Sequence, residues 1–224
     1  MKVRALVLAA ATAALALSTL AGPASAAPSG ATVWVAHGIP GVTVDVCVGT
    51  DEVKSNFKYG RTFKLDAVPA GDYTLKVYLA HAGTCKGTLV ISKAVTLTDG
   101  LNATVVARII GAKPGLQVFA NDLSLGDAGK ASVTVRHTAT APTVDVWVNG
   151  GLAPTVENLA RGDERGPLEV PAGVYSWWVS GDGGYQPVIG PAVGKLESGT
   201  AYQILAVGTA AKNYRFIVIG QPAL

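Results

Sequence analysis

The sequence predicts an all-β protein with two tandem antiparallel β-sandwich domains of immunoglobulin-like appearance. Apolar residues alternate with polar ones between turns rich in Gly, Pro, Asn and Asp, which is typical of half-buried strands. The second half of the chain repeats the first, with about seven such segments in each copy. No segment has the periodicity of an amphipathic helix. Only residues 155–161 permit a helix, and a single turn there is as expected as none.

The first segment of the chain has the parts of a secretory signal peptide. Basic residues precede an apolar run at positions 5–21, and Ala24-Ser25-Ala26 follows as a small-residue cleavage site. An uncleaved membrane anchor is the alternative, but Thr and Ser interrupt the run and make it marginal for spanning a bilayer. We expect cleavage after Ala26, and a mature protein that is secreted, either extracellular or associated with the cell envelope, without membrane insertion.

An internal repeat organises the rest of the chain. Residues 31–48 (ATVWVAHGIPGVTVDVCV) recur as residues 131–148 (ASVTVRHTATAPTVDVWV), and a later Val-Pro-Ala-Gly-x-Tyr element also occurs in both copies. The polar, glycine-containing segment between the copies reads as a linker. The predicted organisation is a signal peptide at residues 1–26, domain 1 at residues 27–121, a linker at residues 122–130 and domain 2 at residues 131–224.

The order of these elements resembles the bacterial Domain of Unknown Function 4397 family. A strand ends in a His, a turn leads to a Val-Asp-Val strand, and the Val-Pro-Ala-Gly-x-Tyr element follows, in both copies. The resemblance implies secreted or envelope-associated β-sandwich proteins and implies no particular activity. The Ser-Pro-like turn that is usual after the His is Gly38-Ile39-Pro40 in the first copy and Thr138-Ala139-Thr140 in the second. The geometry of these turns is therefore not assumed to match the family.

The repeated ionisable residues are His37 and Asp45 in the first copy and His137 and Asp145 in the second. A His-Asp pair can orient a general base, but nucleophilic catalysis also needs a Ser or Cys and an oxyanion site, and no Gly-x-Ser-x-Gly element is present. We therefore favour a structural role. Each His would hydrogen-bond into the following turn, and each Asp would brace a neighbouring loop. An extracellular hydrolase that uses a His-Asp site is the alternative.

Cysteine content and charge narrow the classes of partner. Cys47 and Cys85 are the two cysteines, and a disulfide is expected in an exported chain. Loss of the signal peptide leaves 16 basic residues against 15 acidic ones, so the surface lacks the concentrated positive charge that nucleic acids require. No metal site or cofactor is predicted, because the carboxylates lack the spacing of a calcium loop. We expect a monomer or a weak oligomer.

Aromatic residues of the second copy are the main hint of a function. Strand parity directs Trp177 inward and directs Trp147 and Trp178 outward, with Tyr185 in the glycine-rich loop nearby. The outward rings could form an exposed platform for a ligand. Alternatively, they could pack on each other, under that loop, or against the first copy, where Trp34 is also outward. The predicted function is a non-enzymatic binding or structural module for an unknown extracellular glycan or protein.

Overall fold

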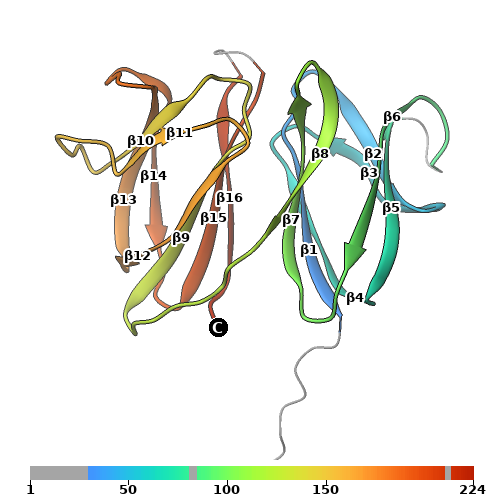
Figure 1. Ribbon diagram of the computed structural model, residues 1–224, viewed down its shortest axis with the longest axis horizontal. Helices are drawn as coiled ribbons and strands as arrows, with labels where there is room; N and C mark the ends of the chain where they lie inside the picture. The colour runs from blue at the N-terminus through green and yellow to red at the C-terminus, as the bar shows by residue number, and fades with distance from the viewer. Residues whose placement is uncertain (1–29, 81–84, 210–212) are drawn as a thin grey trace, which may run out of the picture.

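The computed structural model describes residues 30–80, 85–209 and 213–224 (Figure 1). The predicted signal peptide, residues 1–26, lies outside the described residues. The described ranges form 16 strands, which make four sheets of four strands each. They hold no helix with the length and apolar character of a membrane span. The predicted all-β class with two tandem sandwich-like units is confirmed.

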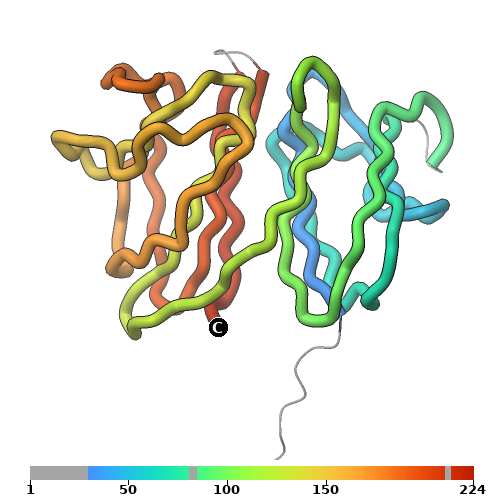
Figure 2. The backbone as a smooth tube through the Cα atoms, viewed as in Figure 1, coloured from blue at the N-terminus to red at the C-terminus, as the bar shows by residue number. Residues whose placement is uncertain are grey.

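Each unit has an inner sheet, which faces the other unit, and an outer sheet, which faces away from it (Figure 1). In the first unit the inner sheet has the order β4 (Thr62–Val68), β1 (Ala31–His37), β7 (Asn102–Ile110), β8 (Lys113–Ala120), and the outer sheet has the order β3 (Asp51–Lys58), β2 (Thr43–Val48), β5 (Gly71–Leu79), β6 (Leu89–Leu97). In the second unit the inner sheet has the order β12 (Glu164–Pro171), β9 (Lys130–His137), β15 (Thr200–Val207), β16 (Arg215–Pro222), and the outer sheet has the order β11 (Val156–Leu159), β10 (Val144–Val148), β13 (Gly173–Gly181), β14 (Pro187–Leu196). The chain passes between the units once, from β8 to β9 (Figure 2).

Neighbouring strands are antiparallel except for one pair in each inner sheet. β1 runs parallel to β7, and β9 runs parallel to β15. Between the two members of each pair the chain crosses to the outer sheet and returns twice, so no hairpin fixes their relative direction. The expectation of antiparallel sheets therefore has one exception in each unit.

The helix-permissive segment at residues 155–161 contains β11 and no helical turn. Val156 and Leu159 are buried and pair with Val146 and Val144 of β10. Pairing with an existing strand while burying two apolar side chains outweighs the weak local preference for a helical turn.

The two sandwich cores follow the alternation in the sequence. Trp177 and Val179 of β13 point into the second core, as their parity predicts, while Trp147 and Trp178 lie outside it. The second core also encloses an apolar cavity of about 90 Å³, compared with about 40 Å³ in the first. The first core contains Phe57, whose position opposite a β2 valine is taken by Leu159 in the second unit. The smaller side chain is one reason why the second core is less filled.

A third apolar cluster joins the units. Its buried members are Ala36 and Val106 of the central inner strands of the first unit, Phe119 of β8, and Leu205, Val207, Ile217 and Ile219 of β15 and β16. The inner sheets are consequently buried on both faces. In β7, for example, Val105 belongs to the core of the first unit, whereas its neighbour Val106 belongs to the cluster between the units. The two units therefore form one packed body.

Polar contacts accompany this apolar interface. The Trp34 indole N–H donates to Gln221 Oε1 at 3.0 Å, so Trp34 meets the inner sheet of the second unit and does not contact Trp147 or Trp178. The buried Arg136 guanidinium donates to Glu164 Oε2 at 2.8 Å and to Asn121 Oδ1 at 2.8 Å, and it lies over the Phe119 ring. These partners compensate a charge that would be costly to bury alone.

Candidate functional site

Both repeated histidines lie inside the sandwiches. His37 is buried against Phe57, with the ring centroids 5.5 Å apart, and its Nδ1 accepts a hydrogen bond from the Ile39 N–H at 3.3 Å. His137 Nε2 lies 3.1 Å from the Ala141 carbonyl oxygen and 2.7 Å from that of Pro142, so this nitrogen carries the proton and donates. Burial lowers the pKa of both imidazoles. Hydrogen bonding to nearby backbone carbonyls raises the pKa, but by less than burial lowers it. Each His contacts the turn that follows it.

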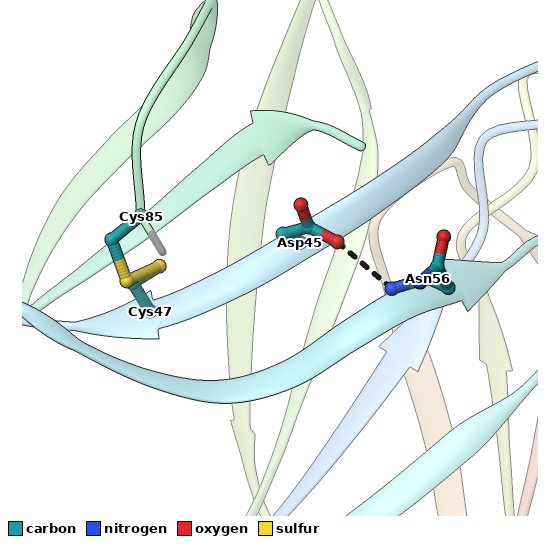
Figure 3. The surroundings of a disulfide bond; sticks show 4 residues. All are labelled: Asp45, Cys47, Asn56 and Cys85. Atoms are coloured by element: carbon teal, nitrogen blue, oxygen red, sulfur yellow. Dashed lines mark hydrogen bonds between the residues drawn. A yellow bond between two sulfur atoms is a disulfide. The ribbon is translucent and has the colours of Figure 1, made fainter. Parts of the chain in front are cut away.

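The repeated aspartates belong to the outer sheets and lie on the face that points away from the core. Asp45 Oδ1 accepts the Asn56 N–H at 2.8 Å (Figure 3), and Asp145 Oδ1 accepts the Asn158 N–H at 2.9 Å. Asn56 and Asn158 have positive φ and lie in the irregular edge strands β3 and β11, where the pairing register shifts. The carboxylate thus holds a bulge in the edge strand of each unit.

The structure separates the histidine from the aspartate in each copy. Val44 and Val46 flank Asp45 and point into the first core, where His37 also lies, so Asp45 points to the other side of the sheet. The second unit repeats this arrangement. Within the described residues the imidazole and the carboxylate therefore do not form a catalytic dyad.

The first unit carries the expected disulfide. Cys47 and Cys85 are bonded, with their Cα atoms 5.9 Å apart (Figure 3). Cys47 has the same parity as Asp45, so the bond attaches the connection between β5 and β6 to the outer face of the sheet. The disulfide prediction is confirmed.

In the second unit an aromatic cluster occupies the corresponding place. Trp147 and Trp178 are cross-strand partners, as Cys47 and Lys76 are in the first unit. Their rings stack with centroids 5.8 Å apart, and Tyr185 packs edge-on against them at 4.9 Å from Trp147 and 5.9 Å from Trp178. Both units therefore fasten the same connection to the outer sheet, one by a covalent bond and the other by ring stacking.

The stacked indoles are not an exposed platform. Trp147 and Trp178 are each 7% exposed, whereas Tyr185 is 57% exposed. The connection between β13 and β14 folds back over them: Asp145 Oδ2 accepts the Gly183 N–H at 2.9 Å, and Ser180 Oγ, near the end of β13, donates to the Gly184 carbonyl oxygen at 2.7 Å. The Trp147 N–H donates to the same Ser180 Oγ at 2.8 Å. The alternative in which the rings pack on each other under the loop is correct, and Tyr185 is the member of this cluster that faces solvent.

Two hollows flank the aromatic cluster. The first, of about 310 Å³, is next to Trp178 and is lined by Gly150, Ser176, Trp178, Tyr185, Gln186, Pro187 and Pro191. The second, of about 280 Å³, is next to Trp147 and includes Glu157 and Asp182. The lining of the first hollow is neutral and that of the second is acidic. Among the described residues, no group of His, Cys, Asp and Glu side chains is arranged to hold a metal ion.

The outer face beside the first hollow has exposed valines only in the second unit, where Lys195 lies opposite Val174. Val174 is 66% exposed and Val193 is 71% exposed. The register places Asp72 of β5 at the position that matches Val174, and Ala94 of β6 at the position that matches Val193. Two equivalent faces of one chain therefore differ in character, and the one with the exposed valines adjoins the exposed tyrosine. Exposed apolar surface of this kind is typical of an interaction site.

Comparison with known families connects these features to a repeated unit. The family model for the domain of unknown function DUF4397 matches residues 31–147 and 138–223. The chain belongs to the DUF4397 family. The two matches agree with two tandem copies. The first includes His37 and the Val-Asp-Val strand of the first copy, and the second begins just after His137 and includes the Val-Asp-Val strand of the second copy. No curated protein gives a significant match to the chain. The DUF4397 assignment carries no activity with it, so any function is argued from the surface itself.

Sequence reasoning identified the aromatic members of this candidate site and missed its polar and proline members. Ser176, Gln186, Pro187 and Pro191 line the first hollow without having been singled out. Ser176 has the same strand parity as Trp178, and Gln186 follows Tyr185 directly, so parity and adjacency were available as signals. Pro191 comes close only through the pairing of β13 with β14.

Proposed function

We propose that this protein is a secreted or cell-envelope-associated binding module without catalytic activity. Its ligand surface is the neutral hollow beside Trp178 and Tyr185 on the outer face of the second unit. The observation that carries the proposal is a hollow of about 310 Å³ with an exposed aromatic ring, on a face whose counterpart in the first unit is polar. Concave sites with aromatic walls and a few polar groups are the usual form of ligand sites in proteins.

The location outside the cytoplasm is supported by two independent features. Residues 1–26 have the charged, apolar and small-residue segments of an export signal in the expected order. The Cys47–Cys85 disulfide is the state of a cysteine pair in an oxidising compartment.

A binding role is favoured over the hydrolase alternative by the placement of the repeated ionisable groups. His137 donates to backbone carbonyls inside the core, and Asp145 accepts two backbone N–H groups on the outer face. Both are committed to holding loops, and neither is directed at a shared substrate position. The hollow, in contrast, is built on strands and on a loop held by stacking and hydrogen bonds, which keeps its walls in a fixed geometry.

Binding of the exported chain to washed envelope fragments of the cells that produce it tests this proposal. Tyr185→Ala is expected to lower the affinity for the fragments by about tenfold, the effect of losing one well-placed aromatic contact. Thr74→Ala is the control on the equivalent face of the first unit, because Thr74 occupies the position that corresponds to Ser176 in the second. Equal binding by wild type, Tyr185→Ala and Thr74→Ala would show that the hollow is not the ligand surface.

A further inference from the structure

We infer that the hollow beside Trp178 accepts one ring of a neutral saccharide. This inference rests on the proposed function and names the ligand of the same surface. It is drawn from the exposed tyrosine, from the polar groups around it, and from the charge of the surroundings.

The aromatic wall is suited to the face of a sugar ring. The Tyr185 ring is more than half exposed, and edge-on contacts with Trp147 and Trp178 fix its orientation. A tyrosine held in this way presents apolar surface at little cost in side-chain entropy, and its hydroxyl remains available as a donor and acceptor. The axial C–H groups of a pyranose offer a complementary apolar face.

The polar groups of the hollow have no partners among the described residues. Ser176 Oγ, the Gln186 amide and the Tyr185 hydroxyl make no side-chain hydrogen bond within these parts of the chain, although the Ser176 backbone N–H donates to Asn149. They provide hydroxyl and amide groups that both donate and accept. Sugar hydroxyls also both donate and accept, so this set of groups matches them.

The charge distribution favours a neutral ligand over an anionic one. No Lys, Arg, Asp or Glu lines the hollow. On the other side of the aromatic cluster, Glu157 and Asp182 line the acidic hollow. An anionic sugar or a phosphate would find no counter-charge in this lining and would be repelled by these carboxylates. Lys195, which lies on the same outer face, is already paired with Glu197 at 3.0 Å. A neutral ring meets neither cost.

The size of the hollow and its single exposed ring limit the ligand further. A volume of about 310 Å³ lies at the small end of ligand sites, which span roughly 300–1,000 Å³, so one ring of a longer chain fills it. A proline-rich peptide is the competing ligand, but the grooves that bind such peptides are lined by several aromatic side chains. Tyr185 is the one aromatic side chain of this hollow that is largely exposed, since Trp178 is covered.

Titration of the full exported chain tests the inference. The probes are uncharged hexasaccharides of glucose, mannose, galactose and N-acetylglucosamine, with polygalacturonate and a proline decamer as competitors of other chemistry, followed by amide chemical shifts. We expect a neutral hexasaccharide to shift resonances around Ser176, Tyr185 and Gln186. Tyr185→Ala should weaken its affinity by about tenfold, and Tyr185→Phe, which keeps the ring, should weaken it less.

A second variant and the envelope assay keep the result decisive. Gln186→Ala removes a polar partner without touching the aromatic stack, so a weaker affinity in a fully folded variant supports the inference. If binding to envelope fragments depends on Tyr185 but no neutral hexasaccharide competes for it, the saccharide inference is wrong and the proposed function stands. If the proline decamer competes instead, the ligand is a peptide. If envelope binding does not depend on Tyr185 at all, the proposed function itself is wrong.

Discussion

Truncation of Leu205 measures how strongly the two units depend on each other. Leu205 is fully buried in the cluster that joins the inner sheets, and its neighbour Ile204 points into the second core. Leu205→Ala removes three carbon atoms, which at about 0.8 kcal/mol for each buried methylene amounts to about 2.4 kcal/mol. The space left behind adds to this, so we expect a loss of about 3 kcal/mol in the free energy of unfolding.

The melting temperature distinguishes one cooperative body from two independent domains. For a body of about 190 residues, a loss of 1 kcal/mol in the free energy of unfolding lowers the melting temperature by about 2–4 °C. Leu205→Ala should therefore lower the melting temperature of a single transition by roughly 6–12 °C. A domain of half this size melting alone would shift by roughly 12–24 °C, and the other domain would not move. Scanning calorimetry with a comparison of calorimetric and van't Hoff enthalpies reports the number of transitions.

Hydrogen exchange locates the effect in the structure. If the units unfold together, Leu205→Ala speeds exchange of protected amides in β2 and β5 of the first unit as well as in β10 and β13 of the second. Ile204→Ala is the matched truncation inside the second core and should act on the same single transition. Two transitions in the wild type, with the first unit unaffected by Leu205→Ala, would refute the coupling of the units.

Three further predictions concern the cores and the disulfide. Reduction of Cys47–Cys85 opens a loop with a sequence separation of 38, which should lower the free energy of unfolding by about 4 kcal/mol. The temperature of the single calorimetric transition of the whole body should fall, and a shift confined to the first unit would contradict the shared interface. Burial lowers the pKa of His37 and His137 below the ordinary value of 6.5, so the unfolded chain binds more protons and stability should fall as the pH drops below about 6.5. The urea midpoint of unfolding, measured between pH 7.5 and 5.5, should depend less on pH when both histidines are replaced by Asn. An unchanged dependence of the midpoint on pH would be evidence against this cause. Leu159→Phe, which introduces into the second core the larger side chain found in the first, should raise the free energy of unfolding in calorimetry by about 1 kcal/mol by filling part of the cavity of about 90 Å³, and a loss of stability would show that the cavity cannot accept the ring.

Much of the candidate site could be predicted from the sequence because it depends on strand parity. Parity alone separates Trp177, which faces the core, from Trp147 and Trp178, which do not. It cannot tell how exposed the outward rings are, because that depends on where the following loop folds. The hydrogen bonds of Ser180 and Asp145 bring that loop over the indoles, and no local pattern encodes their geometry.

The role of the repeated His and Asp depended on long-range contacts in the same way. The repeat predicted that each residue is structural, and it left a His-Asp dyad as the alternative. Whether His37 and Asp45 meet depends on which face of the outer sheet each side chain occupies. His37 comes from β1 of the inner sheet and packs on the core face of the outer sheet, whereas Asp45 lies on its other face. Asp45 stabilises the positive φ of Asn56, and the two residues come together only because β2 pairs with β3.

The sequence by itself determined the class, the duplication and the staple of this protein. Period-two alternation specifies strands, the repeat specifies two units, and the two cysteines of a chain whose sequence predicts export specify a disulfide, because each is a local or compositional property. The tertiary structure alone decided the parallel pair of each inner sheet, the joining of the units through Leu205 and its neighbours, and the burial of the Trp147–Trp178 stack with Tyr185 left exposed. These features arise from surfaces that meet only after the chain has folded, so their energies depend on residues far apart in the sequence.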